Sequence, residues 1–333
     1  MNIYDISEKA GVSIATVSRV LNGSDKVSEK TKNRILAVME EMNYTPNVFA
    51  RGLGLNSMKV IGILCPDASD PYLANAVYHA EQSLKEAGYD TLLSCCGYEL
   101  EDRQKALQLL MSKRIDGVVL IGSSFVEEEK ERCAYILEAA KEIPIVLING
   151  YMSGENIYCS FCNDFQAVFQ VTSALLDKGK ERILFLYRAL SYSGRQKMEG
   201  YKAALKVRGI EPEEQYIVRM NGGIQDSKVQ LQELYEKGLR FDAIVSGEDT
   251  FAAAGIKFAK EAEIAVPEEL DIVGYNNSIL AQATEPELTS IDSRVRATTI
   301  GGIEMLVNVL KGEDVEKKVC ISCKLVERGT TYF

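Results

Sequence analysis

Short runs of consecutive apolar residues recur from Val60 onward and alternate with longer amphipathic stretches. Runs that stay apolar at successive positions are typical of strands buried on both faces of a parallel sheet. The stretches between them, such as Asn75–Ala87 and Arg103–Ser112, repeat their apolar residues at helical spacing. This alternation predicts an α/β fold with doubly wound parallel sheets. The sheets form two units, and the chain passes from one to the other near Asn149–Asn163. The predicted strands are Val60–Cys65, Thr91–Cys96, Gly117–Ile121, Ile145–Ile148, Ile183–Tyr187, Ala243–Ser246 and Leu270–Tyr275.

The start of the chain has no strand pattern and predicts an all-α head of three short helices. They fit Ile3–Lys9, Ile14–Leu21 and Glu29–Met42. Ser13 and Ser28 precede the second and third helices, where a serine side chain can accept a hydrogen bond from a first-turn amide. The expected domains are a head at 1–46, a linker at 47–57 and a core at 58–333, with one lobe at about 58–160 plus 292–318 and the other at about 161–291 plus 319–333.

The first two helices and the turn between them predict a helix-turn-helix, although a plain three-helix bundle is the simpler alternative. The second helix of such a motif presents side chains to the major groove of DNA. Arg19 can grip a guanine edge with two hydrogen bonds, whereas Ile14 and Ala15 offer apolar contact to a thymine methyl. The candidate DNA-facing residues are Ile14, Ala15, Ser18, Arg19 and Asn22 on the open face of the helix, with Tyr4, Ser13 and Thr16 for phosphates.

The distribution of charge favours a nucleic-acid contact at the head alone. The chain of 333 residues has a net charge of −10. Residues 1–60 hold eight basic and six acidic residues, whereas the remainder holds 30 basic and 42 acidic residues. An acidic body repels nucleic acid, so we expect it to face away from DNA. The sequence shows neither a secretory signal nor an apolar run of membrane length, which predicts a cytoplasmic protein whose eight cysteines are reduced thiols.

The helix-turn-helix string itself is highly specific. Residues Asp5–Asn22 read DISEKAGVSIATVSRVLN. This resembles the lactose-repressor (LacI/GalR) family, whose pattern D-[VI]-[AS]-x-x-A-G-V-S-x-x-T-V-S-R-[VA]-[LI]-N is matched at every fixed position. The resemblance continues through Val27–Asn47 and along the whole chain. It implies a transcription regulator with a DNA-binding head, a hinge and a two-lobed core similar to periplasmic sugar-binding proteins.

The resemblance also implies a role for the linker. In this family, the segment after Y-x-P-N forms a hinge helix that enters the minor groove, paired with the hinge of a second chain. The matching residues imply that Leu53 wedges a base step, with Asn47 and Ala50 as further DNA-contacting positions; interdomain packing of Leu53 is the alternative. A wedge costs unstacking and gains a kinked duplex that meets more protein. Gly54 departs from the family, where a long or basic residue is frequent.

Candidate effector contacts lie after the predicted strands of the core. Ligands of parallel α/β sheets bind outside the carboxyl ends of strands, and the resemblance implies a small molecule clasped between two lobes. Tyr72 or Leu73 would offer an apolar face to a sugar ring, and Asp70 could accept from its hydroxyls. Helix capping is the alternative for each polar residue. The candidate effector-contacting residues are Asp70, Tyr72, Leu73, Ser123, Asn149, Asp164, Arg195, Lys197, Glu248, Asp249 and Asn276.

Two of these positions depart from the family. Its ligand-gripping arginine is matched by Lys197, three residues before Gly200, and Arg195 is an alternative. Asn276 stands where the family often has aspartate. Lysine is a point charge and lacks the planar fork of arginine. The sequence therefore favours a neutral sugar or oligosaccharide over a purine or a phosphorylated ligand.

The chain carries no motif that has both the residues and the spacing needed for catalysis, cofactor binding or metal binding. It has one histidine, His79, and neither a nucleophile elbow nor a phosphate-binding glycine loop. Cys159–Cys162 and Cys320–Cys323 have the C-x-x-C spacing of a zinc site. Residues three apart on a β segment, however, point to opposite faces. We therefore expect no enzyme activity, no cofactor and no bound metal, and interpret these cysteines as buried or incidental thiols.

These observations predict a repressor that binds a near-palindromic operator as a homodimer and answers to a small molecule, with a sugar favoured. An enzyme or a transport binding protein would need a catalytic constellation or an export signal, respectively. The direction of the ligand effect stays open. A corepressor-dependent regulator, or a catabolite-control-type regulator with a non-sugar or protein effector, is the alternative.

Overall fold

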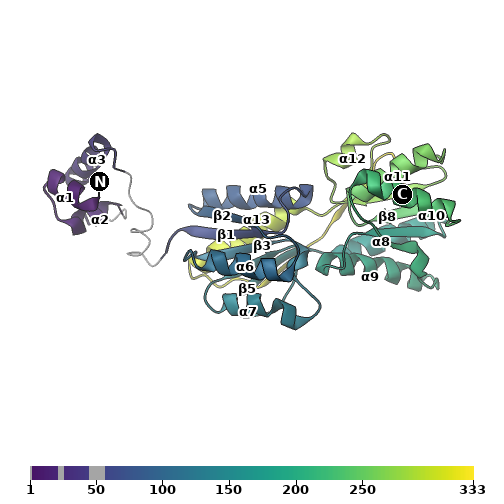
Figure 1. The fold of residues 1–333 in the computed structure, drawn as a ribbon, viewed down its shortest axis with the longest axis horizontal. Coiled ribbons are helices and arrows are strands. Elements are labelled where there is room, and N and C mark those ends of the chain that lie inside the picture. Colours follow the sequence, from purple (N-terminus) through teal and green to yellow (C-terminus); the bar gives the residue numbers. More distant parts are fainter. Residues whose placement is uncertain (1, 22–25, 45–56) are drawn as a thin grey trace.

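The computed structural model describes residues 2–21, 26–44 and 57–333. The head contains α1 (Ile3–Ala10), α2 (Ile14–Leu21) and α3 (Glu29–Glu41), as predicted to within one residue (Figure 1). Gly11 ends α1 at a φ of +61°, a left-handed conformation that glycine adopts without steric cost. Ser13 Oγ accepts from the Thr16 amide at 3.2 Å, so the predicted cap of α2 is confirmed. The helices enclose a small apolar core of Ile6, Ala10, Val17, Val20, Ile35 and Met39.

The remainder of the described chain forms two α/β lobes, each built on a six-stranded sheet (Figure 1). The first sheet has the order β11-β5-β4-β3-β1-β2 and the second the order β12-β10-β9-β8-β6-β7. All neighbouring strands are parallel except β12, which is antiparallel to β10. The strands of the first sheet are β1 (Val60–Cys65), β2 (Asp90–Cys95), β3 (Gly117–Ile121), β4 (Ile145–Ile148), β5 (Ile157–Cys162) and β11 (Lys318–Ile321). Those of the second are β6 (Ile183–Tyr187), β7 (Ile217–Arg219), β8 (Ala243–Ser246), β9 (Asp271–Tyr275), β10 (Thr289–Asp292) and β12 (Lys324–Val326).

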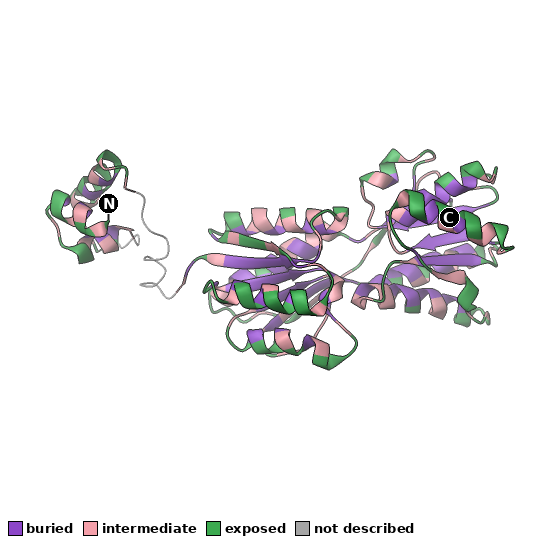
Figure 2. Cartoon of the chain, viewed as in Figure 1, coloured by how far each residue is buried: buried purple, intermediate pink, exposed green. Residues whose placement is uncertain are grey.

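Helices cover both faces of each sheet, which is why the central strands are apolar at successive positions (Figure 2). In the first lobe, α5 and α13 pack on one face and α6 and α7 on the other. In the second lobe, α8 and α9 cover one face and α10 and α11 the other. The helices are α5 (Pro71–Glu86), α6 (Leu100–Met111), α7 (Ala134–Ala140), α8 (Asp164–Asp177), α9 (Tyr192–Val207), α10 (Ile224–Glu236), α11 (Asp249–Glu261), α12 (Ile279–Ala283) and α13 (Val295–Leu310).

All seven predicted strands are present, five of them with the predicted bounds. The short strands β5, β7, β10 and β12 were not among them, because each is brief or interrupted by polar residues. The placement of Cys320 and Cys323 on one continuous β segment is wrong, because two strands occupy this stretch of the chain. Its first part, β11, pairs in parallel with β5, and its last part, β12, pairs with β10 in the other sheet. The lobe boundary expected after residue 318 therefore falls after Ile321.

The chain passes between the two lobes three times. The first crossing follows β5 at Cys162, the second follows β10 at Asp292, and the third joins β11 to β12 through Ser322 and Cys323. The carboxyl ends of strands in both sheets consequently face each other across a cleft. Within the described ranges, no helix is long and apolar enough to cross a membrane.

Candidate functional site

The open face of α2 carries the side chains that the sequence placed there. Val17 and Val20 are buried against the other two helices, whereas Ala15 and Arg19 are exposed and Ile14 is 39% exposed. A short helix can bury only one side, so this division follows from its apolar spacing. The result is an exposed row of two small or apolar side chains and one guanidinium. Side chains of these types can contact base edges in the major groove.

The candidate phosphate contacts surround this face. Tyr4 is 65% exposed on α1. Ser13 and Thr16 lie at the start of α2, where their hydroxyls are 2.9 Å apart, and Ser18 is half-buried. The remaining DNA-contacting candidates, Asn22, Asn47, Ala50 and Leu53, lie outside the described residues.

A cavity of about 160 Å³ lies between the lobes, at the carboxyl ends of strands from both sheets. The structure brings eight of the eleven candidate effector-contacting residues onto its wall. These are Asp70, Tyr72, Leu73, Ser123, Asn149, Lys197, Glu248 and Asn276. The convergence follows from the topology, because each of these residues lies in a loop after a strand or at the start of the following helix.

Two asparagines shape the cleft through their backbone. Asn149 follows β4 with a φ of +66°, and Asn276 follows β9 with a φ of +94°. Asparagine is among the few non-glycine residues that adopt positive φ at modest cost. Each turn ends its strand abruptly and directs the following loop along the cavity. Asp70 caps α5, since its Oδ1 accepts from the Leu73 amide at 2.9 Å, so its second oxygen is the one free of that bond.

Lys197 lies at the base of the cleft and is nearly buried. Its Nζ donates to the Gly247 carbonyl at 3.0 Å and lies 3.6 Å from the centre of the Tyr275 ring. A cation over an aromatic face is attracted by the ring quadrupole. The lysine charge is therefore compensated by a carbonyl oxygen and an aromatic face, and neither of these two partners is a carboxylate.

The cleft also contains a charged pair that the sequence analysis missed. Arg188, directly after β6, donates from Nε to Glu248 at 3.1 Å and lies 4.8 Å from the centre of the Phe251 ring. The hydrogen bond that Arg188 donates to this carboxylate raises the pKa of Arg188 above its ordinary value. Tyr98 lines the same cavity from the other lobe, and burial raises its pKa to about 12. Arg188 could have been identified from the sequence as a cleft residue, because it is a charged residue directly after a predicted buried strand.

Three candidate effector contacts do not line this cavity. Asp164 is buried and accepts a hydrogen bond from the Tyr275 hydroxyl. Asp249 is also buried and accepts from the Ser278 amide and the Ser290 hydroxyl, both at 2.6 Å, while burial raises its pKa. Both carboxylates thus accept hydrogen bonds from within the second lobe. Glu248 lines the cavity instead of the adjacent Asp249.

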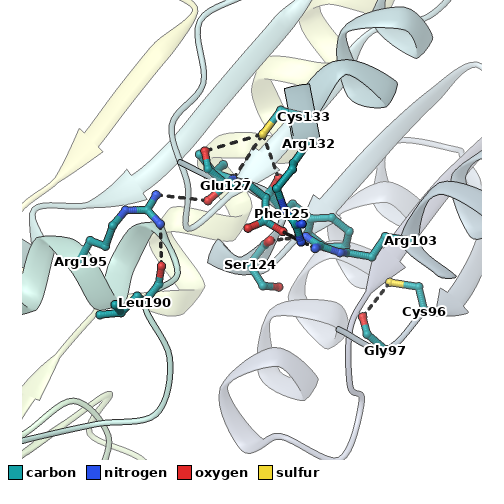
Figure 3. A network of polar contacts seen from close by, with 11 residues as sticks. Cys96, Gly97, Arg103, Ser124, Phe125, Glu127, Arg132, Cys133, Leu190 and Arg195 are labelled. Atoms are coloured by element: carbon teal, nitrogen blue, oxygen red, sulfur yellow. Dashed lines mark hydrogen bonds and ion pairs between the residues drawn. The ribbon is translucent and has the colours of Figure 1, made fainter. Parts of the chain in front are cut away.

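The third is Arg195, which bridges the two lobes beside the cleft (Figure 3). From α9, it donates to the Leu190 carbonyl at 2.6 Å and to the Val126 carbonyl of the first lobe at 3.4 Å. The hydroxyls of Ser123 and Ser191, 2.9 Å apart, make a second contact between the same two loops. Arg195 therefore contributes to the lobe arrangement and not to the cavity wall.

The loop that receives Arg195 is anchored by an internal ion pair. Arg103 is 2% exposed, pairs with Glu127 and donates to the Ser124 carbonyl (Figure 3). The Cys133 thiol accepts from the Glu127 amide at 3.3 Å. Burial raises the pKa of Glu127, but the hydrogen bond and positive charge of Arg103, together with the charge of Arg132, outweigh that effect and leave the pKa below its ordinary value. A charged pair of this kind fixes the loop that carries Ser123 and Val126.

Comparison with known proteins assigns a family to each part of the chain. Residues 2–47 match the model of bacterial regulatory proteins of the lacI family, and residues 58–329 match periplasmic binding proteins and the sugar-binding domain of the LacI family. An HTH-type transcriptional regulator of Lachnoclostridium phytofermentans is 54% identical over the full length of both chains. The regulator AscG of Escherichia coli is 29% identical, covering 98% of this chain and 97% of its own.

The fold has a close experimental counterpart. The Lac repressor dimer bound to operator and the anti-inducer ONPF superposes with a TM-score of 0.87 at 23% identity, covering 99% of this chain and 98% of its own. These relatives are transcription regulators, and none of these matches indicates an enzyme family. The chain belongs to the LacI family of bacterial transcription regulators, with a helix-turn-helix head and a periplasmic-binding-protein-like core.

Proposed function

We propose that this regulator is a cytoplasmic repressor that binds a near-palindromic operator as a homodimer. A small neutral sugar binds in the cleft, the lobes close around it, and the repressor is released from the operator. The observation that carries the proposal is the presence, on one chain, of an exposed row of candidate DNA-contacting residues on α2 and a polar cavity between two lobes. Ligand and DNA affinities must then be reciprocally coupled.

The charges of the cleft support a neutral ligand. Arg188 is paired with Glu248, and Lys197 is bound to a carbonyl and an aromatic ring. A charged ligand would have to break one of these contacts or remain uncompensated. The cavity of about 160 Å³ is below the ~300–1,000 Å³ of pockets for drug-sized ligands, which favours a monosaccharide.

A larger hollow of about 670 Å³ lies beside α5 and α13 and shares Tyr72 and Asn276 with the cleft. We assign the effector to the smaller cavity because loops from both sheets converge there with hydroxyl, amide and carboxylate groups. These are the groups that bind sugar hydroxyls, and they fix ligand orientation in small-molecule sites.

The edge of the first sheet supports association with a second copy. β2 is an edge strand, and Leu93 on it is 49% exposed next to the partly exposed Leu92. Native proteins cover or charge an apolar edge strand, because its unpaired backbone groups otherwise recruit other chains. A second copy of this chain would cover it symmetrically and place two heads for two half-sites.

Selection of bound duplexes from a random DNA library, with the full chain at fixed salt, tests the proposal. We expect an enriched palindrome without added ligand. If enrichment requires an added pool of sugars and purines, the ligand acts as a corepressor and the proposed direction is wrong. Enrichment under neither condition would refute the roles assigned to the residues of α2.

A second test addresses the ligand. A panel of neutral monosaccharides should include one that raises the unfolding temperature by several degrees, since a ligand at 100 times its Kd adds ~2.7 kcal/mol of stability. Arg188→Met should abolish that shift, because it leaves Glu248 unpaired in the cleft and removes a charged hydrogen bond of ~1.5–3 kcal/mol.

Arg182→Met is the matched control. Arg182 precedes the same strand β6 at its opposite end and lies 3.6 Å from Asp242 on the surface. It should leave the sugar-induced shift intact. A chain that responds to no neutral monosaccharide, or an Arg188→Met variant that responds normally, would exclude the ligand class or the site.

A further inference from the structure

Two cysteine thiols meet at the crossings between the lobes. Cys162 ends β5 at the first crossing, and its thiol contacts the Ser293 carbonyl on the second crossing. Cys323 lies on the third crossing, which begins after Ile321, the parallel partner of Cys162, and the Asn163 amide donates to the Ile321 carbonyl at 2.9 Å. Cys162 therefore touches both of the other segments about which the lobes must rotate.

The thiols also lie directly behind the ligand cleft. The Tyr275 hydroxyl is 3.4 Å from Cys323 Sγ, and the ring of the same tyrosine carries the Lys197 ammonium. Tyr72, on the cleft wall, has a buried hydroxyl with no hydrogen-bond partner. A continuous set of contacts thus runs from the cleft to the crossings.

We propose that Cys162 and Cys323 form a redox modification site, at which hydrogen peroxide or another peroxide produces a disulfide that fixes the angle between the lobes. The effect on DNA binding rests on the regulator function assigned above. Formation of the disulfide itself does not.

Formation of the disulfide consumes two thiols and one peroxide molecule. Cys323 is the partly exposed member and lines a surface pocket of about 230 Å³ with Phe333. The neighbouring Cys162 and the Tyr275 hydroxyl lower the pKa of the Cys323 thiol, which favours the nucleophilic thiolate. The thiolate attacks the peroxide oxygen to give a sulfenic acid and hydroxide, and the Cys162 thiol then displaces water to form the S–S bond. Two sulfurs are oxidised, and the peroxide is reduced to two waters.

The location couples this reaction to lobe rotation. A disulfide needs the sulfurs at about 2.05 Å, closer than any hydrogen bond, so its formation must draw the first and third crossings together. A cross-link between two of the three crossings restricts the rotation that a ligand would drive. In a reducing compartment the bond is transient, as expected of a sensor.

The test uses the full chain treated with hydrogen peroxide, alkylated and digested without reductant. We expect a peptide pair linked through Cys162 and Cys323, lost in Cys162→Ala and Cys323→Ala. Cys320→Ala and Cys159→Ala, the other members of each C-x-x-C, are the matched controls and should retain it. Circular dichroism of each variant verifies folding, and Cys323→Ser replaces Cys323→Ala if packing is disturbed.

The second readout is affinity for the selected operator duplex before and after oxidation. We expect a change of at least about tenfold, within the usual range of allosteric coupling, that dithiothreitol reverses and Cys323→Ala abolishes. Absence of the linked peptide would refute the site, and a linked peptide with unchanged operator affinity would refute its regulatory role. Failure of operator selection would overturn the proposed function together with this regulatory role, whereas the linked peptide would still establish the disulfide.

Discussion

Arg19→Ala is expected to relax base preference at one position in each operator half-site while leaving the rest of the preferred sequence unchanged. Arg19 is exposed on α2 between the buried residues Val17 and Val20, so its loss leaves the head core intact. A bidentate contact to guanine is worth ~1–3 kcal/mol of discrimination, and a dimer makes it twice. Competition binding with operators altered at single positions measures the effect.

Arg34→Ala provides the matched control for this result. Arg34 is exposed on α3, which supplies none of the candidate base contacts, and has the same side chain. Its loss should leave base preference unaltered, with at most a uniform weakening that salt reproduces. If Arg19→Ala also weakens every sequence equally, Arg19 contacts phosphate and the base-reading role is refuted.

Asp271→Ala is expected to lower the free energy of unfolding of the second lobe by about 3 kcal/mol, in the range for a broken buried ion pair. Asp271 is 1% exposed and accepts from Lys178 at 2.6 Å, with Lys180 at 2.9 Å. Its Oδ1 also accepts from the hydroxyl of Thr331, which ties the C-terminal segment to β9. Urea denaturation followed by circular dichroism measures the loss.

Asp177→Ala tests whether burial is responsible. Asp177 forms its ion pair with Arg208 on the surface of the same lobe. Exposed pairs contribute ~0–1 kcal/mol, so this variant should denature close to the wild-type midpoint. Equal effects of the two substitutions would contradict the assignment.

The same carboxylate predicts the direction of the pH dependence. Burial raises the pKa of Asp271, but the hydrogen bonds from Lys178, Thr331 and Lys180 outweigh it and hold the pKa below its ordinary value. A group with a lowered folded-state pKa contributes stability above its unfolded value, near 3.9, and loses it as pH falls through the folded value. The difference between wild type and Asp271→Ala should therefore be full at neutral pH and shrink in acid.

Much of the fold was predictable because its signals are local. Five strands have the predicted bounds, including Gly117–Ile121, since burial on both faces requires apolar residues in succession. The helices of the head were equally clear, because Gly11 and Ser13 mark an end and a start by their own backbone and side-chain chemistry. The short strands escaped notice, because β12 has only three residues and is held by its pairing with β10.

The effector site was only partly predictable. Rules of strand topology led to Asp70, Asn149 and Glu248, which line the cavity. They could not distinguish Glu248 from Asp249, although the first faces the cleft and the second is buried against Ser290. That difference depends on how α11 begins after β8, which no spacing of residue types encodes.

Residues a few positions apart were enough to establish the family, the alternation of strand and helix, and the exposed face of α2. Contacts between distant residues required the folded chain: Arg188 with Glu248, Arg195 with Val126, and Cys162 with Ser293. The physical reason is that parallel strands adjacent in a sheet, such as β6 and β8, are separated along the chain by whole helices. Their order, and with it every contact across the cleft and the crossings, is fixed only by packing of the complete lobes.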